Sequence, residues 1–347
     1  MSLLEVRDLV KHFPVRGGVL NRVVGKVHAV NGVSFDISRG ETVGIVGESG
    51  CGKSTLGKCL IRLHEPTSGS IRYDGREITG LSHQAMMDVR RKMQIIFQDP
   101  YSSLNPRLTI RALLAEAIRF HGVVPPAEID DYIMELTRTV GLRPDAADKF
   151  PHEFSGGQRQ RIGIARALSV KPEFIIADEP VSALDVSIQA QVLNLMMDLK
   201  EQFGLTLMFI SHDLKVVEHF CDRVLVMYLG HVVEELPTDD LHGRAKHPYT
   251  RALLGANPID DPRDRRPLTV LRGDVPSPFN PPIGCPFQTR CPRVHDRCRE
   301  AMPPLIALEA NGRTEQVACY AVEQDLAAGR TPGEAAEVAA EAAAGRD

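Results

Sequence analysis

Short apolar runs recur along the first 255 residues, and each run is typical of a strand buried on both faces of a sheet. They lie at residues 42–46, 94–97, 174–177, 205–211 and 223–235. Between the third and fourth runs, residues 186–203 place apolar side chains at helical spacing. Strands that alternate with helices predict a mainly parallel α/β sheet that helices cover on both faces.

Two further patterns complete the predicted architecture. Residues 3–10 and 33–37 alternate apolar and polar side chains, as half-buried strands do, and Asp74-Gly75 marks a hairpin turn. Residues from about 105 to 170 are largely helical in pattern. We therefore expect an antiparallel β subdomain and an inserted helical subdomain within one α/β domain.

Composition divides the chain into three parts. The α/β domain occupies residues 1–255, and a proline-rich extension with little periodicity follows over residues 256–325. The extension is small and contains a cluster of cysteines. The final residues, 326–347, are rich in Ala and Glu with few large apolar side chains, so we expect a frayed or disordered tail there.

Overall composition excludes several classes of protein. The 347 residues are 43% hydrophobic and 25% charged, as in globular proteins with a large core. A net charge of −4 gives no case for broad nucleic-acid binding. We find no uncharged apolar stretch of about 18 residues and no signal-peptide pattern, so we expect a cytosolic location. There, disulfides among the seven cysteines are not expected.

A phosphate-binding loop is the most specific motif in the chain. The sequence GESGCGKST follows a predicted buried strand and opens a predicted helix, which is the context that a P-loop requires. Its residues are Gly47, Glu48, Ser49, Gly50, Cys51, Gly52, Lys53, Ser54 and Thr55. Backbone N–H groups would hold ATP phosphates, Lys53 would reach the β- and γ-phosphates, and Ser54 would bind Mg²⁺.

Polar side chains stand at the ends of three other predicted strands. Asp178 and Glu179 follow one strand, and we expect Asp178 to hold Mg²⁺ and Glu179 to act as general base toward water. His212 and Gln98 end two more strands. Parallel strands deliver such residues to one edge of a sheet, so we expect His212 to contact the γ-phosphate and Gln98 to bind water or Mg²⁺.

A second glycine-containing helix start lies at residues 155–158. Ser155 is a good N-cap, and Gly156 and Gly157 allow a phosphate to approach the backbone closely ahead of Gln158. The segment has no lysine of its own. It therefore predicts the part of a nucleotide site that completes a P-loop from the opposite side.

These motifs occur in the order found in ABC-transporter ATPases, which the chain resembles over residues 1–255. The resemblance implies that the SGGQ segment of one subunit faces the P-loop of another, with ATP between them. It also implies that Phe13 stacks on adenine, although a buried core phenylalanine is the alternative. Ser182 to Asp185 match the loop that crosses this dimer, which adds Asp185 to the ATP site.

Longer segments resemble the ATPase subunits of oligopeptide/dipeptide importers. They are FQDPYSSLNPRLTI, PHEFSGGQRQRIGIARAL, HPYTRALL and GDVPSPFNPPIGCPF. This resemblance implies two membrane permease subunits as partners, near residues 101–107. It further implies a second, non-identical ATPase subunit, an indirect link to a solute-binding protein, and a peripheral position on the cytoplasmic face of the membrane.

Other functions stay open at this stage. Relatives within the same branch import nickel, glutathione or other small solutes. A soluble ABC ATPase of DNA repair or translation is an alternative of another class, but the chain has neither a long insertion nor a second ATPase domain. A non-catalytic subunit is disfavoured because Lys53, Glu179 and His212 are all present.

Four cysteines of the extension predict a metal site. They are Cys285, Cys291, Cys298 and Cys319, with spacing C-x5-C-x6-C-x20-C. This spacing matches neither the usual zinc pairs nor the ferredoxin run, so the residues themselves allow Zn²⁺ or an iron–sulfur cluster. The resemblance to importer ATPases favours a structural [4Fe–4S] cluster, with Zn²⁺ or free thiols as the alternatives. His295 is interpreted as an exposed bystander, with a substitute metal ligand as the alternative, and Cys59 and Cys221 are interpreted as small apolar residues.

Overall fold

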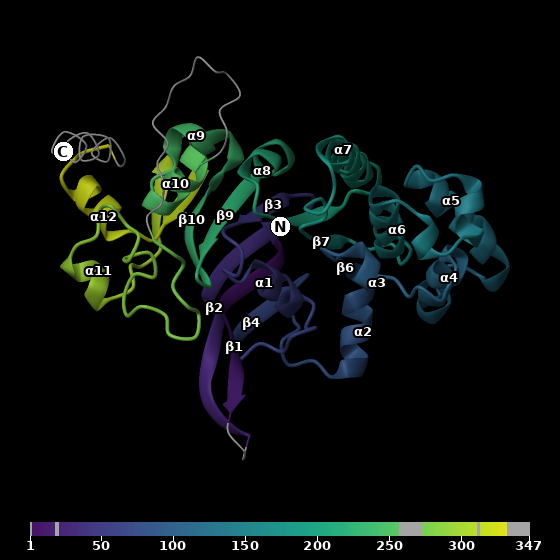
Figure 1. Ribbon diagram of the computed structural model, residues 1–347, viewed down its shortest axis with the longest axis horizontal. Helices are drawn as coiled ribbons and strands as arrows, with labels where there is room; N and C mark the ends of the chain where they lie inside the picture. Colours follow the sequence, from purple (N-terminus) through teal and green to yellow (C-terminus); the bar gives the residue numbers. More distant parts are fainter. Residues whose placement is uncertain (1, 18–20, 257–272, 311–312, 332–347) are drawn as a thin grey trace.

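Two sheets organise the chain in a computed structural model that describes residues 2–17, 21–256, 273–310 and 313–331 (Figure 1). Within these residues, the larger sheet has eight strands in the order β11-β12-β10-β9-β3-β8-β7-β6. The smaller sheet has four strands in the order β2-β1-β4-β5. The proline-rich residues 257–272 and the tail residues 332–347 lie outside the described residues.

The centre of the larger sheet is parallel, as the sequence predicts. Its strands are β3 (Thr42–Val46), β6 (Met93–Ile96), β7 (Phe174–Asp178), β8 (Thr206–Ser211) and β9 (Arg223–Tyr228). β3 pairs in parallel with β8 and β9, and β7 pairs in parallel with β6 and β8. Every residue of β3, β7 and β8 is buried, which explains their runs of consecutive apolar residues.

Helices cover both faces of this sheet, and each face has its own apolar core (Figure 1). These helices include α1 (Lys53–Leu60), α2 (His83–Lys92), α7 (Val186–Phe203) and α8 (Leu214–Phe220). Alternate residues of β8 divide between the cores: Met208 belongs to the core that includes Leu56 of α1, and Phe209 belongs to the core that includes residues of α7 and α8. Consecutive apolar residues therefore stabilise opposite layers.

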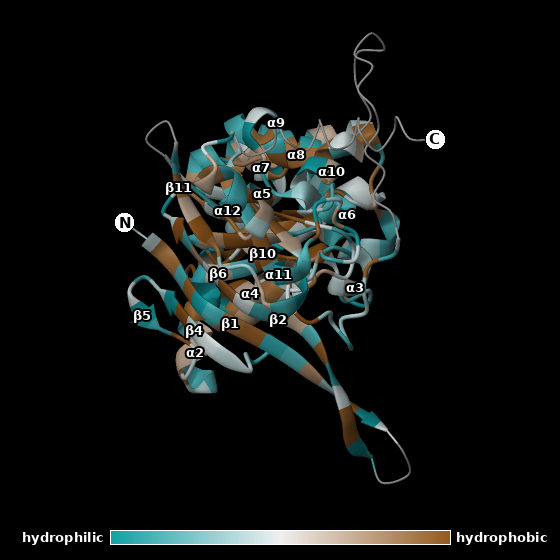
Figure 2. Ribbon diagram, turned by 90° about the vertical axis from the view of Figure 1, so that its left-hand side faces the viewer, coloured by the Kyte–Doolittle hydropathy of each residue, from teal (hydrophilic) through white to brown (hydrophobic). Residues whose placement is uncertain are grey.

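The smaller sheet is antiparallel, as expected. It contains β1 (Ser2–Gly17), β2 (Arg22–Ser38), β4 (Ser68–Tyr73) and β5 (Arg76–Glu77). Asp74 and Gly75 both have positive φ, of 51° and 73°, and form the predicted hairpin turn between β4 and β5. The β1–β2 hairpin is longer than its apolar pattern indicates and projects from the body of the molecule (Figure 2).

The inserted helices form a lobe at the β6–β7 side of the sheet (Figure 1). It comprises α3 (Pro100–Ser103), α4 (Ile110–His121), α5 (Ile129–Thr139) and α6 (Gly156–Leu168), with short 3₁₀ turns at Pro126–Glu128, Pro144–Asp148 and Pro151–Glu153. All of these elements except α3, which precedes it, fall within the helical segment predicted at about residues 105–170. Thr109 caps the start of α4, and Gly122 ends it with a φ of 58°.

The apolar run 223–235 is two strands, where the sequence pattern indicated one. Leu229 and Gly230 have φ values of 46° and 82°, so the chain reverses between β9 and β10 (His231–Pro237). Leu229 is a poor turn residue, and its apolar side chain hid the turn within a continuous hydrophobic pattern.

The C-terminal extension is joined directly to the larger sheet. β12 (Arg313–Val317) pairs with β10, and β11 (Ile306–Ala310) pairs with β12. The remaining C-terminal elements are Thr238–Asp240, α9 (Leu241–Arg244), α10 (Pro248–Ala256), α11 (Asp296–Glu300) and α12 (Tyr320–Ala327). The core and the extension therefore share backbone hydrogen bonds.

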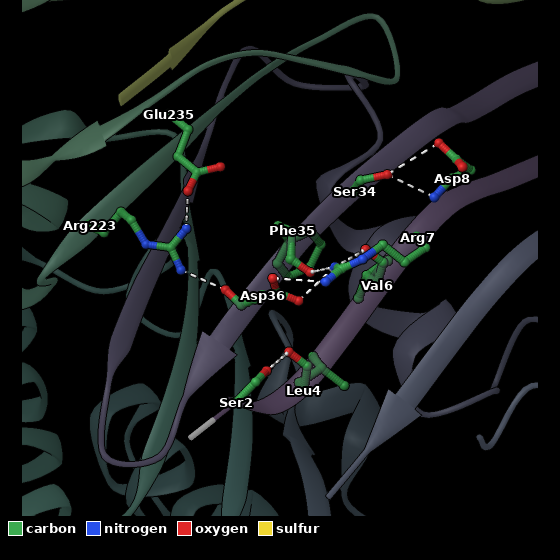
Figure 3. Close-up of polar contacts among 10 residues, drawn as sticks. All are labelled: Ser2, Leu4, Val6, Arg7, Asp8, Ser34, Phe35, Asp36, Arg223 and Glu235. Atoms are coloured by element: carbon green, nitrogen blue, oxygen red, sulfur yellow. Dashed lines mark hydrogen bonds and ion pairs between the residues drawn. The ribbon is translucent and has the colours of Figure 1, made fainter. Parts of the chain in front are cut away.

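Arg223 links the two sheets through three partners, of which Figure 3 draws Asp36 and Glu235. Its Nη2 donates to the backbone oxygen of Asp36 on β2 at 2.6 Å, its Nε lies 2.9 Å from Glu41, and its Nη1 pairs with Glu235 of β10. All three charged side chains are largely buried. Arg7 forms a second ion pair nearby with the Asp36 carboxylate, at 2.6 Å, but both side chains are about half exposed.

Arg223→Ala is expected to lower the free energy of unfolding by about 3 kcal/mol, because two buried carboxylates lose their partner. Arg7→Ala is the matched control and should cost about 1 kcal/mol or less, since exposed ion pairs contribute little. Equilibrium urea unfolding followed by circular dichroism measures both. Equal losses for the two variants would contradict the role given to Arg223.

Candidate nucleotide-binding site

The P-loop is wedged between two strands, and only glycine fits at its contact points. A Cβ atom on Gly47 would lie 2.1 Å from the backbone oxygen of Met227 on β9. A Cβ atom on Gly52 would lie 2.0 Å from the backbone oxygen of Ala29 on β2, and Gly52 also has a φ of 107°. The glycines of the motif therefore position the loop as well as making room for a ligand.

Lys53 begins α1 and is 4% exposed. Its Nζ donates to the backbone oxygens of Gly47 at 2.6 Å and Glu48 at 3.1 Å. The loop thus folds around Lys53 and keeps its ammonium group at the N-terminus of α1. This is where a phosphate would be bound.

Ser54 and Asp178 meet although they are 124 residues apart in the sequence. Ser54 Oγ donates to Asp178 Oδ1 at 2.7 Å, and Asp178 is 2% exposed. Burial raises the pKa of Asp178, while the Ser54 hydrogen bond and the charge of Lys58 act in the opposite direction. A hydroxyl and a carboxylate side by side are oxygen ligands that suit Mg²⁺, so these residues fit a nucleotide with its metal ion.

Glu179 lies at the centre of the remaining predicted residues. Its Oε2 accepts from Gln98 Nε2 at 2.9 Å and lies 3.4 Å from His212 Nδ1, while its Oε1 is 3.9 Å from Lys53 Nζ. The structure therefore brings together, at the carboxyl edge of the sheet, side chains from the ends of β6, β7 and β8 and from the P-loop. Their individual roles stay predictions.

Glu179 also has an unusual backbone conformation. Its φ is 45°, a region that residues other than glycine seldom adopt. Hydrogen bonds hold it there: its N–H donates to the oxygen of Ile210, and its own oxygen accepts from Ser182. Strain of this kind clusters at functional sites, where the surrounding structure maintains it.

The SGGQ segment starts α6, at the base of the helical lobe. Ser155 and Gln158 form a reciprocal capping box, with bonds of 3.4 Å and 3.0 Å. A Cβ atom on Gly157 would lie 2.4 Å from the Ile188 side chain of α7. This close approach is a second reason for glycine that the sequence did not reveal. Among the described contacts, none joins residues 155–158 to the P-loop of the same chain, and their role across a dimer stays a prediction.

Two residues assigned by resemblance have local roles in the structure. Asp185 caps α7, accepting from Ile188 N at 3.0 Å and Ser187 Oγ at 2.8 Å, and these bonds lower its pKa. Phe13 lies on β1, and its ring forms a T-shaped pair with the His64 ring at a centroid distance of 5.2 Å. Neither contact tests the predicted role of these two residues toward ATP.

The structure adds one residue that sequence reasoning missed. Arg290 of the extension forms a two-point ion pair with Glu48 of the P-loop, with distances of 2.6 Å and 3.0 Å. The two residues are 242 positions apart. No local pattern links residues at such a separation, so the sequence held no signal for this pair.

The four cysteines of the extension are free thiols. The Cys285 N–H donates to the backbone oxygen of Cys298, and burial raises the pKa values of Cys285 and Cys291 to about 11 and about 12. Within the described residues, no group of three or more Cys, His, Asp or Glu is placed to hold a metal ion. The structure therefore gives no support to the predicted [4Fe–4S] cluster or to Zn²⁺.

Three other interpretations from the sequence can be compared with the structure. Cys59 and Cys221 are buried, as expected of small apolar residues. The interpretation of His295 as an exposed side chain is wrong: its ring is partly buried and its Nε2 is inaccessible, because it packs beside Tyr320. None of the helices in the described part of the chain has the length and apolar character needed to span a bilayer.

Comparison with solved structures finds the same fold. The chain superposes on "MJ0796, a Bacterial ABC Transporter Cassette" with a TM-score of 0.61 and 29% identity, covering 68% of this chain and 98% of that chain. It also matches cbiO1 of Clostridium perfringens with a TM-score of 0.59 and 28% identity, over 69% of this chain and 90% of that one.

Comparison with sequences extends the similarity to the C-terminal part. The chain is 54% identical to the oligopeptide transport ATP-binding protein AppF of Bacillus subtilis, over 87% of this chain and 93% of that protein. It is 50% identical to a probable peptide ABC transporter ATP-binding protein, y4tS of Sinorhizobium fredii, over 97% and 95% of the two chains. Residues 30–182 match the ABC transporter family, and residues 233–298 match the oligopeptide/dipeptide transporter C-terminal region. The chain therefore belongs to the ABC-transporter ATP-binding proteins of the oligopeptide/dipeptide transporter family.

Proposed function

We propose that this chain hydrolyses ATP to power the import of oligopeptides or dipeptides through partner membrane subunits. The observation that carries the proposal is the meeting of Lys53, Ser54, Asp178 and Glu179 at one sheet edge. Relatives named for oligopeptide and peptide transport, similar along most of the chain, support the solute class.

The residues of the site divide the chemistry between them. Lys53 binds the β- and γ-phosphates, and Ser54, Asp178 and Gln98 provide oxygen ligands for Mg²⁺, which when bound stabilises the charge that develops on the phosphates. Glu179 takes a proton from the attacking water. His212, 3.4 Å from Glu179, would contact the γ-phosphate from the end of β8.

Two ATPase subunits are needed for a complete site. Residues 155–158 lie on the helical lobe and make no described contact with the P-loop of their own chain, which supports their use by a partner subunit. ATP between two subunits binds the closed dimer better than the open one, so it can drive closure. We propose a non-identical second ATPase subunit, two permease subunits near residues 101–107, and an indirect link to a solute-binding protein.

The proposed assembly implies where the protein is located and what each part of the chain does. Contact with the permeases would hold the protein at the cytoplasmic face of the membrane. We propose residues 1–255 as the ATPase domain, 256–325 as the transporter-specific extension and 326–347 as a tail. Nickel, glutathione or another small solute is the alternative cargo.

A [4Fe–4S] cluster in the extension remains part of the proposal, with Zn²⁺ as its alternative. What supports it is the sequence, which places four cysteines in one segment, three of them buried; the described residues do not bring three metal-binding groups together. Such a site would stabilise a segment that has little core of its own.

Glu179→Gln is expected to lower kcat for ATP hydrolysis by about 100-fold or more, because the amide cannot accept a proton from water. ATP affinity should be retained, since Lys53 and Ser54 are unchanged. Steady-state hydrolysis and nucleotide titration measure the two effects. Glu201→Gln, on an exposed position of α7, is the control and should behave as wild type. Undiminished hydrolysis in Glu179→Gln would remove this residue from the role of base.

Protein purified without oxygen is expected to show the broad visible absorption of an iron–sulfur cluster, and Cys319→Ser should lose it because one thiolate ligand is gone. Cys221→Ser is the matched control, since this buried cysteine lies outside the extension and should leave the absorption unchanged. Colourless wild-type protein with stoichiometric zinc would replace the cluster by the zinc alternative, and colourless metal-free protein would refute both.

A further inference from the structure

The C-terminal extension reaches into the nucleotide-binding loop. Arg290 Nη1 lies 2.6 Å from Glu48 Oε2, and Nη2 lies 3.0 Å from Glu48 Oε1, so the guanidinium and carboxylate planes meet at two points. The Arg290 side chain is 6% exposed and that of Glu48 is 26% exposed. An ion pair shielded in this way is weakly screened by salt and has fixed geometry.

The backbone of Glu48 connects the Arg290 ion pair to Lys53, the lysine of the P-loop. Its N–H donates to the Tyr249 hydroxyl of α10 at 2.9 Å, and its carbonyl oxygen accepts from Lys53 Nζ at 3.1 Å. A continuous chain of polar contacts therefore runs from Arg290 through Glu48 to Lys53.

An aromatic cluster holds the side chains of Tyr249 and Arg290 in place. The ring of Phe287, which is fully buried, lies 5.4 Å from Tyr249 and 5.2 Å from Tyr228. The Arg290 N–H donates to the backbone oxygen of Phe287 at 3.0 Å, and the Arg290 guanidinium lies over the Tyr228 ring at 5.9 Å. Arg290 is thus positioned before any ligand arrives, at little further cost in side-chain entropy.

We propose that Arg290 is a positioning residue for nucleotide binding, which holds the P-loop in its binding shape and cancels the charge of Glu48 beside the ATP phosphates. The inference deepens the proposed function and rests on it. A carboxylate in the phosphate-binding loop would repel a polyanion, and repulsion is strong where water is partly excluded. Arg290 removes that repulsion, so the extension contributes to the ATP site.

A second ion pair in the extension provides a matched control. Arg293 contacts Asp325 with two bonds of 2.7 Å and 2.9 Å, and these side chains are 15% and 0% exposed. Its two-point geometry resembles that of the Arg290 pair, but both partners belong to the extension. Arg293→Gln should therefore lower stability without changing ATP affinity.

The test measures ATP and ADP dissociation constants by titration of the full chain, together with kcat and KM. Arg290→Gln is expected to weaken nucleotide binding about tenfold and to raise KM, with kcat at saturating ATP largely kept, because Glu48 is left uncompensated. The double variant Glu48→Gln/Arg290→Gln should regain most of the nucleotide affinity, since neither charge of the ion pair is left. Arg290→Lys should fall between wild type and Arg290→Gln, because it keeps the charge but loses the two-point geometry.

Each alternative result has a defined meaning. Unchanged affinity in folded Arg290→Gln would overturn the inference, and so would a double variant that binds as weakly as the single one. If Arg290→Gln does not fold, the double variant decides, since it leaves no unpaired charge: near wild-type affinity supports the inference and a tenfold loss overturns it. Wild-type protein that binds no ATP would instead overturn the proposed function, and the inference with it.

Discussion

The fit of the P-loop between two strands is the constraint on which the rest of the site depends. Gly47 and Gly52 approach the backbones of β9 and β2 so closely that no side chain could be accommodated. This contact fixes the start of α1, and with it the directions of Lys53 and Ser54. Asp178 and Glu179 can then meet them, because β7 lies two strands away in a sheet whose parallel strands all end at this edge.

The C-terminal extension is built into this arrangement at three levels. β12 pairs with β10 in the main sheet, Phe287 packs against Tyr228 and Tyr249, and Arg290 pairs with Glu48. The structure thereby explains two segments that the sequence assigned only by resemblance, HPYTRALL and GDVPSPFNPPIGCPF. They provide the aromatic support on which the ion pair with the P-loop rests.

The glycines of the SGGQ segment show how one pattern can have two causes. The sequence predicts a phosphate-binding helix start. The capping box of Ser155 and Gln158 confirms the helix start and its N-cap, while phosphate binding there stays a prediction. The packing of Gly157 against Ile188 adds a steric requirement between α6 and α7. Packing within this chain therefore requires glycine at position 157.

The sequence by itself determined the features that depend on neighbours in the chain. Buried strands, the P-loop, helix caps and the Asp74-Gly75 turn follow from local composition, since each is governed by side-chain periodicity or backbone conformation. Only the tertiary structure decided which distant residues meet. Periodicity carries no information about partners 124 or 242 residues apart, as in the Ser54–Asp178 and Arg290–Glu48 contacts. The apolar pattern also hid the turn at Leu229, because this buried leucine continues the hydrophobic run between the two strands.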